Sequence, residues 1–454
     1  KNNKGTEDNR VRKLDYSIQI SKLFYERFIK DEEITLFSPH ETPGLYEAFG
    51  MPEFDEMYEM YERKTSISKK KIRAQELFMN LLKERAETGR IYIMNIDHCN
   101  THSSFKDKVY MSNLCQEITL PTTPVQHIDD EDGEIALCIL SAVNLGLIRD
   151  KDDLEELCDL SVRALDEIID YQEYPILAAK QSAQSRRSLG IGYIGLAHYL
   201  AKNHVAYGDK EALELVDETT EAFQYYLLKA SNQLAIEKGQ CEYFEKTKYS
   251  DGILPIDTYK KDIDKIVKRK LSYDWKQLRK DIQEHGLRHS TLSAQMPSES
   301  SSVVSNATNG IEPPRDYLSV KKSKKGTLKQ IVPDYYRLKN FYTLLWDMPS
   351  NEGYINVVAT MQKYFDQAIS GNWSYNPQNY KDGEVPISVM ANDLLTTYKL
   401  GWKTSYYQNT YDAKTDLDEP AHPVGWHDNQ KEMKSREEFE SQEDYDDYCE
   451  ACMI

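Results

Sequence analysis

The sequence predicts an α/β protein with a flexible tail, and three observations support this fold class. Short apolar runs rich in β-branched residues, such as RIYIMNI at 90–96, indicate strands. Two longer segments, 154–172 and 217–238, repeat apolar residues at spacings of three and four, which indicates helices, and Gly239 is expected to be the C-cap of the second. Strands that alternate with helices of this length favour parallel pairing. Finally, the composition changes sharply after about residue 412.

The earlier part of the chain divides into helical and strand-like segments. Residues 11–90 predict mainly helix, because YSIQISKLFYERFIKD at 16–31 and KKKIRAQELFMNLLKERAETG at 69–89 carry apolar residues at helical spacing. Two further apolar runs, around 114–120 and 135–140, fit buried strands. They are joined by HIDDEDGE, whose residues are typical of a turn-rich loop.

Residues 412–454 predict a flexible acidic tail. This segment has few large aliphatic residues, so it cannot bury enough apolar area to offset the entropy lost on ordering. A short helix around 430–444 is the one element that we consider there. The tail carries Cys449 and Cys452 near its end.

Composition and charge exclude several classes of protein. The 454 residues carry a net charge of -18, which argues against tight binding to nucleic acid. No apolar run is long enough for a membrane span, and no secretory signal opens the chain. Seven irregularly spaced cysteines favour a reducing, cytoplasmic environment over a disulfide framework. The chain begins KNNKGTEDNR without a methionine, so we expect that it starts inside a longer sequence.

Several local patterns have simpler explanations than catalysis. GIGYIG at 190–195 matches a dinucleotide fingerprint, but the polar SAQSRRSL precedes it where a strand is required, so close helix packing is preferred. DHCNTH at 97–102 offers zinc ligands without a second pair at a usual distance. Cys158 and Cys241 are best explained as inert thiols. Tyr225 and Tyr226 lie within a predicted helix, where core packing explains them.

One constellation does point to chemistry. Asn113 and Glu117 each lie two residues from Cys115. In an extended segment the three side chains would point to one face, bringing together a thiol, an amide and a carboxylate. Such a set provides a reactive sulfur, an orienting hydrogen bond and a general base. On its own the N-x-C-x-E pattern is weak, and a purely structural role remains open.

The wider sequence resembles a known family. SNLCQEITLPT, GEIALCILSAVNLG, MPSESSSVVSNATNGIEPPR and TSYYQNT occur in one order, and LFSPHETPGLYEAF, LPIDTYKK and STLSAQMPSE are also typical of the family. Together they are similar to the large (alpha) subunit of class Ia ribonucleotide reductase. The resemblance implies that residues 1–411 are the C-terminal portion of a ten-stranded α/β barrel, with a catalytic loop near 113–117 threading its centre.

The resemblance also implies roles for the residues of this loop. Cys115 would become a thiyl radical and remove the 3′ hydrogen of the ribose. Glu117 would accept the proton of the 3′ hydroxyl, and Asn113 would hydrogen-bond the substrate, which Leu114 and Gln116 also contact. These roles imply reduction of ribonucleoside diphosphates to 2′-deoxyribonucleotides for DNA synthesis.

Residues outside the loop complete the implied site. Cys138 would be one of two cysteines that reduce the 2′ position and end as a disulfide. Tyr406 and Tyr407 would be the last relay that carries the radical to the thiol. The substrate diphosphate would be held by a turn that contains Glu299, Ser300 and Ser301, through backbone N–H groups.

The tail cysteines would act as a redox shuttle. The resemblance implies that Cys449 and Cys452 re-reduce the active-site disulfide and are themselves reduced by thioredoxin or glutaredoxin. A flexible chain of roughly 40 residues spans on the order of 35 Å, which is adequate for this purpose. Their C-x-x-C spacing is tighter than the C-x4-C of close relatives, which alters strain and reduction potential.

Two more departures from the family limit the expected activity. The partner of Cys138 lies upstream of residue 1 in the family, and none of the seven cysteines fits it. Tyr411 stands where many relatives have arginine. We therefore expect either a piece cut from a longer chain or one half of a split subunit, which needs the upstream part of the alpha subunit, where ATP and dNTP effectors bind. It also needs a small (beta) subunit, whose metal pair generates the radical; no metal or cofactor is expected on this chain.

Two alternatives of other classes remain. A thiol–disulfide oxidoreductase would work through Cys449 and Cys452 alone and would not need Cys115. A non-catalytic regulatory protein would retain the reductase fold without turnover. Cobalamin-dependent reductases share the thiyl chemistry but need no tyrosine relay, so Tyr406 and Tyr407 favour the class I interpretation.

Overall fold

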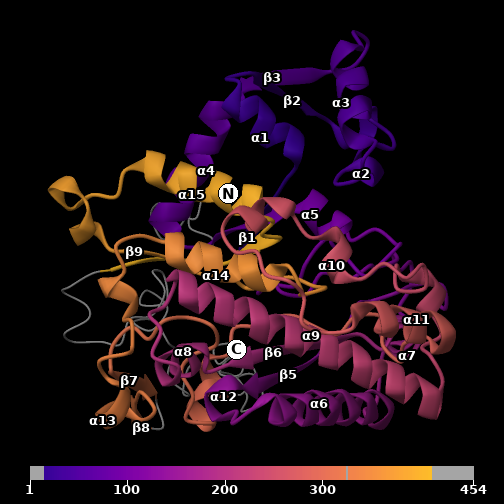
Figure 1. Ribbon diagram of the computed structural model, residues 1–454. Coiled ribbons are helices and arrows are strands. Elements are labelled where there is room, and N and C mark those ends of the chain that lie inside the picture. The colour runs from indigo at the N-terminus through magenta and orange to yellow at the C-terminus, as the bar shows by residue number, and fades with distance from the viewer. Residues whose placement is uncertain (1–14, 324–325, 412–454) are drawn as a thin grey trace, which may run out of the picture.

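The structure, a computed structural model, describes residues 15–323 and 326–411 (Figure 1). The predicted tail at 412–454, the helix considered within it and both tail cysteines lie outside the described residues. The strands are β1 Tyr16–Ile20, β2 Glu33–Phe37, β3 Lys69–Arg73, β4 Ile91–Asn95, β5 Ile139–Asn144, β6 Leu189–Ile194, β7 Leu318–Ser323, β8 Gly326–Ile331, β9 Trp373–Tyr375, β10 Thr404–Ser405 and β11 Gln408–Thr410.

Helices account for most of the remaining regular structure. They are α1 Lys22–Ile29, α2 Leu45–Ala48, α3 Phe54–Arg63, α4 Ala74–Thr88, α5 Ile96–Thr101, α6 Lys151–Tyr171, α7 Leu177–Arg186, α8 Leu196–Lys202, α9 Lys210–Lys238, α10 Pro255–Thr258, α11 Trp275–His285, α12 Glu299–Val304, α13 Tyr335–Leu338, α14 Glu352–Gln362 and α15 Ile387–Leu400. None of these helices is both long and apolar enough to cross a membrane.

The strands form several small sheets. β4 pairs in parallel with β1 and antiparallel with β10, while β5 pairs in parallel with β6 and β9 with β11. Single bridges continue the β5–β6 pair through Ser293 and then join Gln295 to Ile369. The α/β class and the parallel pairing are confirmed. The described strands do not close into a barrel, and the expected ten-stranded arrangement is not found among them.

The main core lies between helices and the β5–β6 pair. α6 and α9 lie side by side and cover these strands, and α14 also packs against α9 (Figure 1). Tyr193 of β6 packs edge-on against Phe223 of α9, and its hydroxyl lies 3.0 Å from that of Thr220. The two long predicted helices are confirmed as α6 and α9, and Gly239 ends α9 with a φ of 90°.

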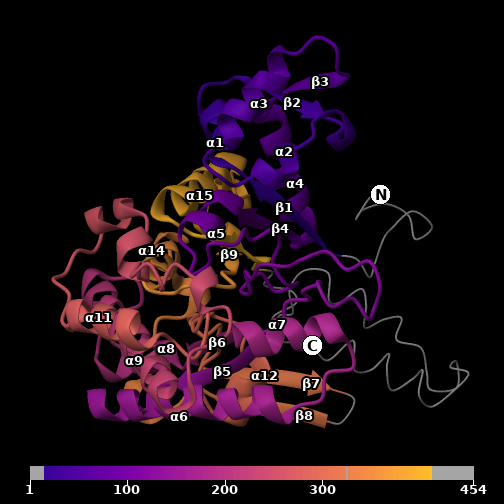
Figure 2. The same cartoon turned by 90° about the vertical axis from the view of Figure 1, so that its right-hand side faces the viewer.

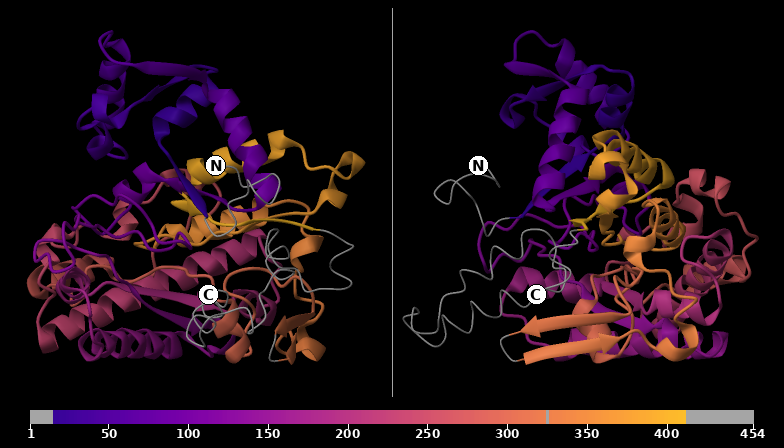
Figure 3. Two further views of the ribbon diagram at one scale, coloured as in Figure 1. Left: turned by 180° about the vertical axis from the view of Figure 1, so that it is seen from behind. Right: turned by 90° about the vertical axis from the view of Figure 1, so that its left-hand side faces the viewer.

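A second unit stands above this body. It contains α2, α3 and the antiparallel β2–β3 pair, with its own small core around Phe54, Tyr58 and Tyr61 (Figure 2). α1 and α4 connect it to the main core, to which they contribute Tyr25 and Phe78. The β7–β8 hairpin projects from the opposite end (Figures 2 and 3). The prediction of helix throughout 16–31 and 69–89 was wrong at both starts, because β1 and β3 precede their helices directly. β1 and β3 have five residues each, which is too few for the spacing of apolar residues to distinguish a strand from a helix.

Two predicted strands are placed differently. Residues 114–120 form a loop, so the prediction of a strand there was wrong. The reason is that hydrogen bonds between Asn113 and Ile118 close this part of the chain into a turn. The 135–140 run is irregular up to Cys138, and β5 begins at Ile139. The strand at 90–96 is confirmed as β4.

Residues 190–194 of the GIGYIG motif lie in β6, a strand buried at every position, and Gly195 is the N-cap of α8. The prediction of close helix packing was therefore wrong. Its glycines permit close approach of other chain segments: a Cβ at Gly190 would lie 2.9 Å from the sulfur of Cys138. A Cβ at Gly192 would lie 2.7 Å from the carbonyl oxygen of Ala294. Both separations are shorter than a side chain tolerates.

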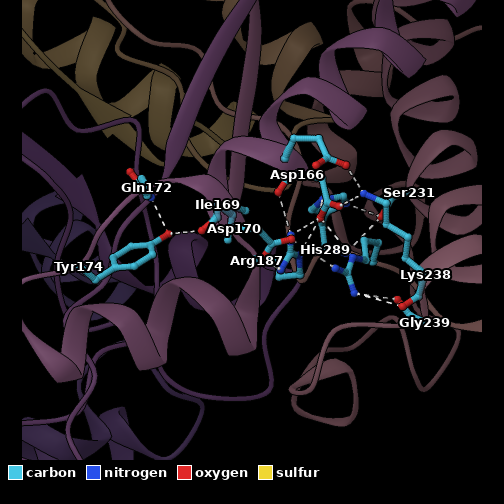
Figure 4. A network of polar contacts seen from close by, with 12 residues as sticks. Asp166, Ile169, Asp170, Gln172, Tyr174, Arg187, Ser231, Lys238, Gly239 and His289 are labelled. Carbon is cyan, nitrogen blue, oxygen red and sulfur yellow. Dashed lines mark hydrogen bonds and ion pairs between the residues drawn. The ribbon is translucent and has the colours of Figure 1, made fainter.

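A buried polar network ties α6 to the strands and to α9 (Figure 4). Asp166 of α6 is fully buried and pairs with Arg187 at 2.6 Å, with Lys238 and Arg288 at 3.2 Å, and lies 3.2 Å from His289. The contact with His289, together with the charges of Arg187 and Arg288, holds the pKa of Asp166 well below its usual range despite its burial. Burial lowers the pKa of His289 to about 4.

Candidate active site

The candidate catalytic loop is a closed turn. The backbone N–H of Asn113 donates to the carbonyl of Ile118 at 3.2 Å, and the side-chain oxygen of Asn113 accepts from the N–H of Ile118 at 3.1 Å. Gln116 adopts a φ of 73° and donates to the Asn113 carbonyl from its backbone. This reversal brings residues 113 and 117 together without an extended segment. The predicted convergence is thus found, although its predicted cause was wrong.

A second segment, residues 366–370, forms hydrogen bonds with the loop. The N–H of Ala368 donates to the carbonyl of Glu117 at 3.0 Å. The hydroxyl of Ser370 lies 2.5 Å from the carbonyl oxygen of Cys115 and 3.1 Å from Oε2 of Glu117. One hydroxyl therefore contacts both the backbone of the thiol residue and the carboxylate.

Tyr406 reaches the thiol from β10. Its phenol donates to the sulfur of Cys115 at 3.5 Å. β10 pairs with β4 through Ser405 opposite Ile93, and the same register continued by one residue places Tyr406 opposite Tyr92. The rings of Tyr406 and Tyr92 lie 4.7 Å apart, and those of Tyr406 and Tyr407 lie 4.1 Å apart. Tyr406 is buried and Tyr407 is half-buried, so the ring pair leads outward from the thiol.

Burial dominates the electrostatics of the site. It raises the pKa of Cys115; the Tyr406 hydrogen bond opposes this rise, and the nearby Glu117 carboxylate adds to it. Burial also raises the pKa of Glu117, against hydrogen bonds from Asn113 and Ser370 that favour the ionised form. The pKa of Tyr406 lies far above its ordinary value for the same reason. At neutral pH the thiol and the phenol therefore keep their protons.

Cys138 lies close to the same loop. Its half-buried side chain packs against the small apolar cluster that contains Leu120 and Cys99. Burial raises the pKa of its thiol, and the carboxylate of Glu117 adds to the rise. The side-chain amide of Gln367 is 3.6 Å from the sulfur.

The predicted phosphate-binding residues form one exposed helical turn. Glu299, Ser300 and Ser301 are the first three residues of α12, and all three are exposed. α12 follows residues 293–295. In this short segment Ser293 bridges Ile191 of β6, and Gln295 bridges Ile369 of the 366–370 segment. Its first turn leaves backbone N–H groups without intrahelical acceptors.

The two histidines and the cysteine of the DHCNTH motif are occupied by protein contacts. His98 Nδ1 lies 2.9 Å from the carbonyl oxygen of Trp402, and His102 Nε2 lies 2.6 Å from that of Gln362. Cys99 donates to the carbonyl of Lys403. Within residues 15–323 and 326–411, no group of His, Cys, Asp and Glu side chains is arranged to hold a metal ion. Cys158 and Cys241 are buried, and burial raises the pKa of both thiols.

Sequence reasoning missed several residues that position the site. Ser370 and Gln367 follow α14 and reach the loop from about 250 residues away along the chain. Lys403 is buried and donates to three successive carbonyls of residues 365–367; burial lowers its pKa to about 7. Arg85 is fully buried, bonds the carbonyl of Tyr407 and lies 5.3 Å from the ring of Trp373. No local motif marks any of them.

The fold and the site together indicate one class of chemistry. A thiol in contact with a buried tyrosine, beside a carboxylate and a second thiol, provides the groups of an α/β oxidoreductase that works through sulfur.

Comparison with known proteins names the family. A model described as ribonucleotide reductase, barrel domain, matches residues 1–408, so the chain belongs to this family. The chain is 60% identical over 424 residues to the ribonucleoside-diphosphate reductase subunit alpha of Haemophilus influenzae. This match covers 92% of the chain and 56% of that relative.

Two other relatives extend the comparison. The ribonucleoside-diphosphate reductase 1 subunit alpha of Escherichia coli is 57% identical over 93% of this chain and 56% of its own length. The alpha subunit of phage T4 is 46% identical over 91% of this chain and 55% of its own length. The chain thus spans about half the length of these relatives.

Proposed function

We propose that this chain is a catalytic component of a ribonucleoside-diphosphate reductase that converts ribonucleotides to 2′-deoxyribonucleotides. The observation that carries the proposal is the contact between the Tyr406 phenol and the Cys115 sulfur, in a loop that also presents Glu117. The names of the relatives support the reaction, and the residue types in contact support this assignment of roles.

The reaction begins with transfer of a hydrogen atom along this contact. A radical on the Tyr406 oxygen takes the hydrogen of the Cys115 thiol, which restores the phenol and leaves a thiyl radical. The thiyl radical takes the 3′ hydrogen of the ribose while Glu117 accepts the 3′ hydroxyl proton. Since the carboxylate is buried and Ser370 and Asn113 donate to it, it is held in place for this proton.

Reduction at the 2′ position needs two thiols. The 2′ hydroxyl leaves as water, and two electrons and two protons come from Cys138 and a second thiol, which are left as a disulfide. The hydrogen atom then returns from Cys115 to the 3′ position, and the radical returns to Tyr406. We place the second thiol on the upstream part of the alpha subunit.

The exposed apolar surface near the loop supports this need for an upstream partner. Met111, Leu114, Leu137 and Leu140 expose between 37% and 56% of their surface. Among the described strands β5 pairs only with β6, which leaves its other edge free to accept a strand. We propose that upstream strands complete a ten-stranded barrel here, with the 113–117 loop inside.

The remaining components are assigned by resemblance. The first turn of α12, with Glu299, Ser300 and Ser301, would hold the substrate diphosphate. Cys449 and Cys452, outside the described residues, would carry reducing equivalents from thioredoxin or glutaredoxin. A small subunit would supply the radical to Tyr407 and Tyr406, and nucleotide effectors would bind upstream. The free thiols fit a reducing compartment such as the cytoplasm.

The test is a reconstitution. The chain is mixed with a cognate small subunit and dithiothreitol, with and without the upstream polypeptide, and reduction of a ribonucleoside diphosphate is measured. We expect turnover only with the upstream polypeptide, and none after Cys115→Ser. Turnover without it would contradict the role given to the upstream thiol. A stable complex without turnover in any mixture would favour a regulatory protein that retains the fold.

A further inference from the structure

The sulfur of Cys138 is confined on two sides. On one side lies Gly190 of β6, where a Cβ would come within 2.9 Å of the sulfur. On the other side lies Gln367, whose Nε2 is 3.6 Å from the sulfur. The absence of a side chain at residue 190 therefore makes the space that the sulfur occupies, and the amide of Gln367 closes it.

The orientation of the Gln367 amide is fixed by its other partners. Its Oε1 accepts from the backbone N–H of Thr119 at 3.2 Å, and its Nε2 donates to the carbonyl of Leu189 at 2.9 Å. Turning the amide over would place two donors together at Thr119 and two acceptors together at Leu189. The second N–H of the amide consequently faces the sulfur, which must accept.

The backbone of Gln367 is held as firmly as its side chain. Its N–H donates to the carbonyl of Ser293 at 3.0 Å, and its carbonyl accepts from Lys403 at 2.8 Å and from Gln362 at 2.9 Å. The side chain is 0% exposed. Little conformational freedom remains, so the donor stays on the sulfur through changes elsewhere in the site.

We propose that Gln367 is a positioning residue for the redox chemistry of Cys138: it holds the sulfur against Gly190 and presents an N–H donor to it. The redox role of Cys138 rests on the proposed function, whereas the hydrogen bond and its effect on the thiol do not. Through Thr119 the same amide fixes the sulfur relative to the loop that carries Glu117.

The donor matters most when the sulfur carries charge. When an external thiolate attacks the partner sulfur of a disulfide that contains Cys138, a new S–S bond forms and the old one breaks. Cys138 then leaves with the electron pair as a thiolate. Exchange is faster when the leaving thiolate is stabilised. Burial raises the pKa of Cys138, and the Gln367 hydrogen bond is the contact that opposes this rise.

The test uses the full chain alone. Reduced protein is alkylated with iodoacetamide across a range of pH, and labelling of Cys138 and Cys115 is followed separately by peptide mass spectrometry. Gln367→Met removes the donor with little change of size. In this variant we expect the rate of alkylation of Cys138, at pH values below the pKa of its thiol, to fall roughly three- to tenfold. Without the donor a smaller fraction of the thiol is ionised, and this loss exceeds the gain in nucleophilicity of the remaining thiolate. Cys115, which Gln367 does not contact, serves as the internal reference.

Two further variants separate the role from simple packing. Gln362→Met changes a buried glutamine that bonds the same segment but not the sulfur, and we expect no effect on Cys138. Gln367→Glu keeps an acceptor for Thr119 but sets a carboxylate beside the sulfur, so labelling of Cys138 should be slower than in Gln367→Met.

Three outcomes would overturn the proposal. An unchanged pH profile at Cys138 in both Gln367 variants would do so, as would an equal fall at Cys115. An equal effect of Gln362→Met would show that loosening of the segment is the cause. Failure of nucleotide reduction in the reconstituted enzyme would leave these alkylation results standing, so the two proposals fail separately.

Discussion

The phenol of Tyr406 donates a hydrogen bond to the sulfur of Cys115 at 3.5 Å, although the two residues are 291 positions apart along the chain. The contact depends on the β10–β4 pairing, which sets Tyr406 beside the loop, and on the closed turn at 113–118, which presents the sulfur. It is short enough for a hydrogen atom to move directly between oxygen and sulfur.

The first prediction concerns this contact. Tyr406→Phe removes the hydroxyl and nothing else, so hydrogen-atom transfer loses its acceptor, and we expect at least about a 1000-fold loss of turnover in the reconstituted enzyme. Binding of the substrate, measured by equilibrium dialysis, should not change. Tyr225→Phe, in the aromatic cluster on α9, is the matched control and should retain full turnover. Substantial turnover in Tyr406→Phe would exclude the relay.

The second prediction concerns pH. Burial raises the pKa of Glu117, and Ser370 opposes the rise by donating to the carboxylate. The base works only when ionised, so turnover falls as the pH falls through this raised pKa. Ser370→Ala removes a donor to the ionised form and should raise the pKa further, moving the acidic limb of the kcat/KM profile to higher pH. A limb that stays in place, or moves to lower pH, would contradict the assigned base.

The third prediction concerns acid stability. The pKa of His289 is lowered to about 4 in the folded protein, below the value of about 6.5 for an unfolded chain. Between these values the unfolded state binds a proton that the folded state does not, so stability is lost as the pH falls through this window. The part of the loss from pH 7 to pH 5 that comes from His289 should be about 2 kcal/mol, measured by urea unfolding. The buried His98 and His102, whose pKa values are also lowered, add to the total loss.

A control isolates the contribution of His289. His289→Asn should remove that part of the pH dependence, although it also lowers stability at pH 7 by disturbing the Asp166 network. His285→Asn, at an exposed position at the end of α11, is the matched control and should change the free energy of unfolding at pH 7 by less than about 0.5 kcal/mol. If both variants kept the full pH dependence, His289 would not be its source.

The fourth prediction concerns Gly190. A methyl group there would lie 2.5 Å from Leu140 Cδ2 and 2.9 Å from the Cys138 sulfur. Gly190→Ala should therefore lower the free energy of unfolding by roughly 1–3 kcal/mol, because β5 must shift away from β6. An unchanged urea midpoint would mean that the neighbouring side chains move without strain.

The fifth prediction concerns assembly. Leu140 on β5 is 42% exposed beside the free strand edge. Leu140→Glu should weaken binding of the upstream polypeptide at least about tenfold, measured by sedimentation, because a buried unpaired carboxylate is unfavourable. Leu160→Glu, at an exposed position on α6, is the matched control. Equal binding by both variants would place the contact surface elsewhere.

Much of the fold could be predicted where the periodicity was long. α6 and α9 have 21 and 29 residues, so their apolar spacing is clear. β1 and β3 have five residues each and run directly into helices, and a window that includes both elements shows the helical period. The closed turn at 113–118 was missed because an asparagine side chain closes it, and its apolar residues resemble a strand.

The candidate site divides in the same way. Asn113, Cys115 and Glu117 could be found because they are close in sequence. Ser370 and Gln367 could not, since serine and glutamine are common and only the tertiary fold brings them to the loop.

The shared contact of Ser370 has a mechanical consequence. Because one hydroxyl touches both the Cys115 backbone and the Glu117 carboxylate, displacement of the 366–370 segment carries the two groups together. A motion of this segment would therefore move the Cys115 backbone and the Glu117 carboxylate in the same direction.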